Sequence, residues 1–322
     1  MFQRPHWLAY IQDFTGGDVV VLALYDGNNL AGFFSGVIIK KFGIPILGSP
    51  FRGWMTGYMG FNLLPDASRI EAIKCVELFA FRELGCWHLE ILDYGLSFEE
   101  AESMGYDFRR FETYLTDLRV SKDDIFSGMS SSCRRAYRKS VKENLVVEVA
   151  EPEGFASEYY DQVKDVFAKQ DMTPTYSLER VEKLIANVHP SGDLLLARVR
   201  NPDGKSIATG IYPGFGTFCY FWGNGSWRQY QNARPNEALH LFAMHYWKDR
   251  GTDFYDWGGA SSYKLKYGVT SHFVPGLKKS RSRSILFARN MAERLYYLPR
   301  RFKRQLYVKK VGVPDNVRPG GS

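Results

Sequence analysis

The stretch that decides the fold is Tyr263-Lys264-Leu265-Lys266-Tyr267-Gly268, which follows the turn Asp256-Trp257-Gly258-Gly259. A helical pattern over residues 235–250 and a short apolar strand over residues 253–257 precede that turn. A lysine placed beside the end of an apolar strand is a compact cation suited to a phosphate or a developing oxyanion. The alternative interpretation is an exposed polar turn that carries ordinary surface lysines.

The upstream segments extend this pattern. Tyr220-Phe221-Trp222-Gly223 ends a strand, Pro235-Asn236-Glu237 opens the helix, and Lys248-Asp249-Arg250-Gly251 closes it. With the turn and the Tyr-Lys-x-x-Tyr-Gly segment added, the order resembles the C-terminal half of FemABX-type aminoacyltransferases and their acyltransferase relatives in the GNAT superfamily. Those proteins read aromatic-x-x-Gly, a helix ending in Gly, Tyr-Asp-x-x-Gly and Phe-Lys-x-x-Phe-Gly.

The resemblance covers most of the chain and is strongest from about residue 190 to residue 280. It implies a tandem pair of GNAT-like domains. Two features depart from the family: Tyr263 and Tyr267 stand where most members have Phe, and the long helical arm of some members is absent.

The remaining pattern predicts an α/β chain, of α+β type, with two tandem GNAT-like domains. Each has a mixed, mostly antiparallel sheet flanked by helices. We expect an N-terminal domain over residues 1–118, a catalytic domain over 119–283 and a basic helical tail over 284–322. The two domains share the outline of hairpin strands, helix and strand without shared sequence.

Composition fits a globular protein: of 322 residues, 45% are hydrophobic and 24% charged. No apolar run is long enough for a spanning helix, and the N-terminus does not look like a secretory signal. The four cysteines are scattered, so we expect reduced thiols and no metal site. These features indicate a cytoplasmic protein.

Charge is unevenly distributed. Residues 276–310 hold 12 Lys or Arg and one acid, which gives +11, so the rest of the chain sums to about 7 − 11 = −4. From residue 284 to residue 307 the tail is amphipathic, with a predicted apolar stripe of Ile285, Leu286, Met291, Leu295 and Leu298. Such a tail can bind the inner face of an anionic membrane, or it can present its cations to RNA. The alternative is that it is only a solvated extension.

The segment that precedes the 235–250 helix bears on the acyl donor. Acetyl-CoA-binding members of the superfamily carry Gln/Arg-x-x-Gly-x-Gly/Ala there, and its backbone amides cradle the pyrophosphate. Residues 228–236 contain no glycine. This difference disfavours acetyl-CoA and agrees with the FemABX branch, where the donor is aminoacyl-tRNA. A longer acyl-CoA or an acyl carrier is not excluded.

We expect Lys264 and Asp256 to be catalytic: Lys264 would neutralise the oxyanion or a phosphate, and Asp256 would orient the amine or accept its proton. Asp256 is equally suited to cap the turn that follows it. His240 and His245 are spaced too poorly for a metal or a dyad. The expected substrate-binding residues are cations, aromatic rings and one amide: Arg134, Arg135, Arg138, Lys139, Tyr220, Trp222, Asn236, Tyr263 and Lys266.

The resemblance implies an acyltransferase that forms an amide between an activated donor, aminoacyl-tRNA, and an amine on a phosphate-bearing cell-wall or related acceptor. No cofactor is expected, because the donor is a co-substrate; tRNA and an anionic membrane are the expected partners. Two alternatives stay open. One is an N-acyltransferase that uses acyl-CoA or an acyl carrier on an amino sugar or amino acid. The other is a non-catalytic RNA- or membrane-binding module.

Overall fold

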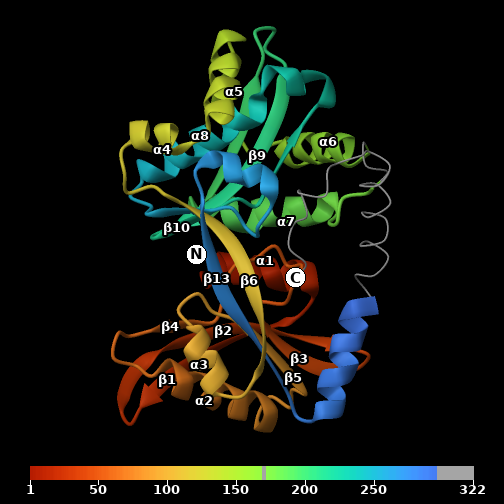
Figure 1. Cartoon of the computed structure of the whole chain (residues 1–322). Helices are drawn as coiled ribbons and strands as arrows, with labels where there is room; N and C mark the ends of the chain where they lie inside the picture. Colours follow the sequence, from red (N-terminus) through yellow and green to blue (C-terminus); the bar gives the residue numbers. More distant parts are fainter. Residues whose placement is uncertain (169–171, 296–322) are drawn as a thin grey trace. The chain divides into compact units, whose positions relative to one another are not determined.

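The computed structural model describes residues 1–168 and 172–295 (Figure 1). They form two compact units. Among the described residues, unit 1 contains residues 3–10, 112–168 and 172–272, and unit 2 contains residues 11–111 and 273–295. Three elements contribute residues to both units: α1 (Pro5–Thr15), β6 (Asp107–Asp117) and β13 (Thr270–Ser280).

Unit 2 is a sheet with strand order β1-β2-β3-β5-β13, and β4 pairs with β2. Only β3 and β5 are parallel within this order. Its core lies between the sheet and α2, where Ile73 and Val76 pack with Leu89, Ile91 and Leu277. The elements are β1 (Asp18–Asp26), β2 (Asn29–Lys41), β3 (Ile44–Ser49), β4 (Phe61–Leu63), α2 (Arg69–Arg82), β5 (His88–Leu92) and α3 (Phe98–Ser103). Residues 283–295 are also helical.

Unit 1 has the strand order β6-β12-β10-β9-β8-β7, in which β10 and β12 are parallel. Its helices are α4 (Lys122–Gly128), α5 (Ser131–Lys142), α6 (Phe155–Ala168), α7 (Leu178–Val188) and α8 (Pro235–Lys248). Its remaining strands are β7 (Val146–Val149), β8 (Leu194–Arg200), β9 (Ser206–Phe215), β10 (Phe218–Tyr220), β11 (Gly223–Ser226) and β12 (Phe254–Asp256). Three 3₁₀ helices complete it: η1 (His189–Ser191), η2 (Arg228–Ala233) and η3 (Ser262–Tyr267).

The strand path divides after β10. The Phe221 amide still donates to the Asp256 carbonyl at 2.7 Å, but the Trp222 amide donates to Ile211 of β9. From there β11 pairs with β9 alone among the described strands. The chain leaves the end of β12 through the turn 256–259, and the motif of residues 263–268 follows that turn.

Side chains alternate across β12. Tyr255 and Trp257 join the aromatic core beneath α8, together with Phe221 and Tyr267. Asp256 points to the opposite face of the strand, as alternation requires. The strand therefore delivers one buried carboxylate to the end of a sheet whose other face is apolar.

The predicted mixed α/β fold with sheets flanked by helices is confirmed. The compact units do not begin and end where the predicted domains do. Residues 273–280 of β13 belong to unit 2 because Gly276–Ser280 pair with His88–Leu92 of β5. The predicted tail over 284–322 is helical as far as residue 295, and its remainder lies outside the described residues.

Candidate functional site

The turn after β12 is built around the Asp256 carboxylate. Its Oδ1 accepts hydrogen bonds from the Thr113 hydroxyl at 2.5 Å and from the Gly258 amide at 2.7 Å. The Gly259 amide donates to Thr113 Oγ1 at 3.2 Å. Both glycines have positive φ, 62° and 80°, a backbone conformation that other residues adopt only with strain. Asp256 therefore organises the turn, which is the capping role that the sequence allowed.

Lys264 stabilises the same turn by bonding to the backbone carbonyl oxygens of the turn. Its Nζ donates to the backbone oxygens of Trp257, Gly258 and Gly259 at 2.6, 3.1 and 2.9 Å. The side chain is only 6% exposed, so it is not the surface lysine of the alternative interpretation. Burial lowers the pKa of Lys264 to about 8, although the nearby Asp256 charge acts in the opposite direction. An ammonium has three N–H donors, and all three are used here.

Aromatic rings fix the segment on both sides of Lys264. Tyr267 stacks on Trp257 with ring centroids 4.5 Å apart and an interplanar angle of 28°. His240 packs against both rings and shares a 2.9 Å hydrogen bond with the Tyr255 hydroxyl. Burial lowers the pKa of His240 well below its ordinary value, so this imidazole is neutral at neutral pH. We infer that His240 belongs to the core that supports the turn.

Lys266 and Asn236 connect the motif to the start of α8. Lys266 Nζ lies 2.6 Å from Glu237 Oε1, and that carboxylate is buried. The Asn236 side chain accepts a 3.1 Å hydrogen bond from Asn224 of β11. Both residues are thus engaged within the protein, at the place where η3, α8 and β11 meet.

Tyr220 and Trp222 occupy different surroundings. A Cβ at Gly258 would lie 2.6 Å from the Tyr220 hydroxyl, so Tyr220 packs directly on the turn. Burial and the Asp256 charge raise the pKa of Tyr220. Trp222 instead packs against Tyr176, with centroids 5.1 Å apart, and its buried Nε1 has no partner in the described part of the chain. Tyr263 is half-exposed at the start of the motif.

The four cations of α5 do not form one clamp. Arg134 is used inside the protein, where it donates to the carbonyls of Ser127, at 2.5 Å, and Met129 at the end of α4. Lys139 donates to Asn232 at 3.0 Å. Arg138 is exposed and lies over the Phe126 ring, while Arg135 is exposed and has no bonded partner among the described residues. Among these four residues, Arg135 and Arg138 are therefore the cations that face solvent, and Lys142 at the end of the helix is exposed as well.

The glycine-free segment before α8 folds as the 3₁₀ helix η2. Its amides serve its own structure, since Tyr230 donates to Trp227 at 3.0 Å and Arg234 to Gln231 at 3.1 Å. The Arg228 amide donates to the Asp165 carboxylate. Pro235, which has no N–H, then opens α8. The loop of free backbone amides that cradles a pyrophosphate is replaced here by a closed helical turn.

Comparison with known families matches residues 127–266 to the family described as "Acetyltransferase (GNAT) domain". That range holds α5, β7 to β12 and both lysines of the motif, Lys264 and Lys266. This part of the chain therefore has the sequence pattern of a GNAT acetyltransferase domain. No curated protein sequence matches it significantly.

Solved structures show the same architecture at low sequence identity. FemX superposes with a TM-score of 0.67 and 14% identity, covering 85% of this chain and 91% of FemX. L-PGS from Bacillus licheniformis superposes with a TM-score of 0.54 and 14% identity, covering 88% of this chain and 95% of that one. The resemblance inferred from the sequence is confirmed at the level of the fold: the chain has a FemAB-like GNAT fold.

Two site residues were missed by sequence reasoning. Thr113 reaches Asp256 from 143 positions away, so nothing local in the sequence signals it. Glu237 could have been noticed as an acid in the first turn of α8, near a lysine-rich motif. Among residues 1–168 and 172–295, no three His, Cys, Asp or Glu side chains gather as a metal site would require, and no helix has the length and apolarity needed to cross a bilayer.

Proposed function

We propose that this acyltransferase moves an aminoacyl group from tRNA to an amine on a phosphate-bearing cell-wall or related acceptor. The observation that carries the proposal is the closed η2 turn before α8. The Arg228, Tyr230 and Arg234 amides bond within the protein, so this 3₁₀ turn suits the pyrophosphate of a CoA thioester less well than an open glycine loop does. A donor held by other contacts, such as the backbone of a tRNA acceptor stem, suits this surface better.

The reaction is the attack of a neutral amine on the ester carbon of the donor. A C–N bond forms, the ester C–O bond breaks, and the proton lost by the amine reaches the released ribose oxygen. The intermediate is an oxyanion, so catalysis depends on positioning and on charge placed near that oxygen. No covalent enzyme intermediate is needed.

Lys264 is the charge we assign to that oxyanion. Its longest hydrogen bond, 3.1 Å to the Gly258 carbonyl, is the one we propose it exchanges for the oxyanion as the intermediate forms. The other two bonds would keep the ammonium in place. Asp256 and Thr113 hold the turn while this exchange occurs, and we propose positioning roles for both.

Arg135 and Arg138 are the proposed contacts for phosphates of the donor or acceptor. Both are exposed on α5, and Lys139 of the same helix bonds to Asn232 just ahead of α8. Arginine suits phosphate because its planar fork donates two parallel hydrogen bonds.

The proposal is tested by donor competition. Purified full-length protein is given a pool of aminoacyl-tRNAs, acetyl-CoA, long-chain acyl-CoA or an acyl carrier protein, each with the same library of phosphate-bearing amines. Mass spectrometry then identifies any amide product. We expect product with aminoacyl-tRNA alone, at a rate that falls steeply as salt rises. Product from an acyl thioester, with none from tRNA, would establish the N-acyltransferase alternative instead.

A further inference from the structure

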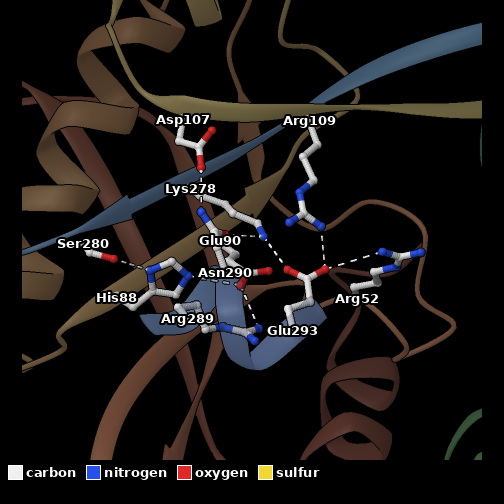
Figure 2. Close-up of polar contacts among 10 residues, drawn as sticks. All are labelled: Arg52, His88, Glu90, Asp107, Arg109, Lys278, Ser280, Arg289, Asn290 and Glu293. Atoms are coloured by element: carbon white, nitrogen blue, oxygen red, sulfur yellow. Dashed lines mark hydrogen bonds and ion pairs between the residues drawn. The ribbon is translucent and has the colours of Figure 1, made fainter. Parts of the chain in front are cut away.

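Unit 2 contains a buried polar network that the proposed chemistry does not use (Figure 2). Glu293 of the 283–295 helix accepts from Lys278 of β13 and Arg109 of β6, both at 2.6 Å, and Arg52 lies 3.5 Å away. Burial alone would raise the pKa of Glu293, but the hydrogen bond and charge of Lys278 and the charge of Arg109 outweigh it and lower the pKa to about 2. The carboxylate is therefore ionised at neutral pH.

Two more helix residues complete the contact. Arg289 lies 2.8 Å from the buried Glu90 of β5, and Asn290 donates to Asp107 at 3.2 Å (Figure 2). Two residues before Glu90 on β5, His88 shares hydrogen bonds with Glu90 and with Ser280 of β13. Along β5 and β13 the alternate residues Leu89, Ile91 and Leu277 belong to the core under α2. One face of these strands is thus apolar, and the face that meets the 283–295 helix is charged.

The helix is consequently inverted relative to an ordinary surface helix, which buries its apolar side. Phe287, Met291 and Leu295 are spaced four residues apart and so share one face. They are 67%, 38% and 61% exposed, opposite the buried Glu293. Ala288 and Ala292 are exposed beside them. We call Phe287, Met291 and Leu295 the outer stripe.

The outer stripe differs from the stripe that the sequence suggested. Ile285 and Leu286 are half-buried on the inner side, while Met291 and Leu295 point outward as expected. Leu298 lies outside the described residues. The ion pairs of Glu293 and Arg289 explain the difference, because they determine which side of the helix faces the sheet.

The charges around the outer stripe identify its partner. Glu293 is the sole acid between residues 281 and 295, and it is neutralised on the inner side. The exposed surface of the helix therefore carries apolar side chains and the cations Arg283 and Arg294, without an acid. We propose that the outer stripe inserts into the surface of an anionic lipid bilayer, and that the Glu293 network holds the helix in the orientation that exposes it.

Other occupants fit this surface less well. RNA would use the cations and aromatic rings but gains little from Met291 and Leu295. A second copy of the chain would bring like charges together across the contact. An interface helix with apolar residues on one side and arginines around it matches the general pattern of bilayer-bound helices.

The test compares Phe287→Glu with Phe42→Glu, a matched control. Phe42 is 102% exposed at the β2–β3 turn, in the same unit and outside the helix. Full-length proteins are sedimented with phosphatidylcholine vesicles, with and without phosphatidylglycerol, at low and high salt. We expect the wild type and Phe42→Glu to bind the anionic vesicles, and Phe287→Glu to bind them about tenfold or more weakly, as loss of one inserted side chain implies.

Measurements at high salt distinguish binding through the outer stripe from binding through charge attraction alone. High salt suppresses the Coulomb part of binding, so the difference between Phe287→Glu and wild type must persist there. Equal binding of the two proteins overturns the proposal. So does a wild-type dimer in sedimentation velocity that Phe287→Glu dissociates, or a lower melting temperature for Phe287→Glu than for Phe42→Glu, because either shows that protein covers the stripe. The result is independent of the donor assay.

Discussion

Lys264 combines burial, a lowered pKa and three carbonyl partners, so its loss affects both the turn and the proposed chemistry. We predict that Lys264→Ala and Lys264→Met each lower kcat roughly a hundredfold, the usual scale for removing one oxyanion-stabilising donor. The control is Lys122→Met, which removes an exposed lysine paired with Asp249 in the same unit. Steady-state kinetics with the identified donor give the measurement, and a kcat within a few-fold of wild type would remove Lys264 from the site.

The same lysine makes a pH-dependent contribution to stability. Because its pKa is about 8 in the folded protein and 10.5 ordinarily, the unfolded chain binds more protons between these values. The free energy of unfolding should therefore rise with pH in this window, by about 2 kcal/mol between pH 8 and 9.5. Denaturant titrations at several pH values measure it. Lys264→Met should lack this slope, and an identical slope in both proteins would assign it to another group.

At the scale of single residues, the sequence singled out Lys264 but did not predict which atoms it contacts. The motif pointed to Lys264, and the spacing placed it beside the end of a strand. Its three partners are the backbone oxygens of Trp257 and of two glycines with positive φ, and the sequence pattern does not encode which way those carbonyls point. Arg134 shows the same limit, since its bonds to α4 carbonyls depend on the packing of two helices.

Among the elements, α5 offers a direct test of phosphate binding. We predict that Arg135→Glu with Arg138→Glu raises KM severalfold while kcat changes little, because these exposed arginines would bind substrate equally in the ground and transition states. The matched control is Lys40→Glu with Lys41→Glu, two adjacent exposed lysines at the end of β2. If both double variants give wild-type KM values, α5 is only a solvated helix.

The stability that the 283–295 helix gives the protein should fall at acid pH, because Glu293 becomes protonated there. Its pKa of about 2 lies below the ordinary 4.5, so its stabilising contribution is complete above pH 4.5 and is lost as pH falls toward 2. We predict that Glu293→Gln lowers the melting temperature at pH 7 and that the gap from wild type narrows at pH 3. Calorimetry at the two pH values measures this, and a gap that stays constant would show that ionisation of Glu293 is not involved.

Most elements were predictable because their periodicity and end signals agree. The helix of residues 235–250 and the strand of 253–257 appear as α8 and β12 with ends shifted by one or two residues. The inverted 283–295 helix was not predictable, since an apolar stripe in a sequence is ordinarily read as the buried side. Only charges outside the helix, on β5, β6 and β13, reverse that assignment.

For the whole molecule, the concentration of basic residues near the C-terminus predicts that this segment binds anionic partners and can be removed without unfolding the protein. A chain truncated after Leu298 keeps the outer stripe but loses Arg300, Arg301, Lys303, Arg304, Lys309 and Lys310. We expect it to stay folded and to lose the salt-sensitive part of its binding to anionic vesicles or tRNA, because each basic residue near an anionic surface adds about 1 kcal/mol. Co-sedimentation and filter binding at low salt measure this, and unchanged retention of both partners would show that these cations are not an anchor.

Unit 2 is built from two separate parts of the chain, and this has a consequence for synthesis on the ribosome. Unit 2 begins at the amino end of the chain, yet its sheet needs β13, which pairs with β5 and is translated nearly 180 residues after it. Until then β5 presents an unpaired edge to the cell, the type of surface that recruits other strands. Unit 1 is nearly continuous and can mature first. A nascent chain stalled before residue 270 should therefore bind chaperones through its oldest part, not its newest.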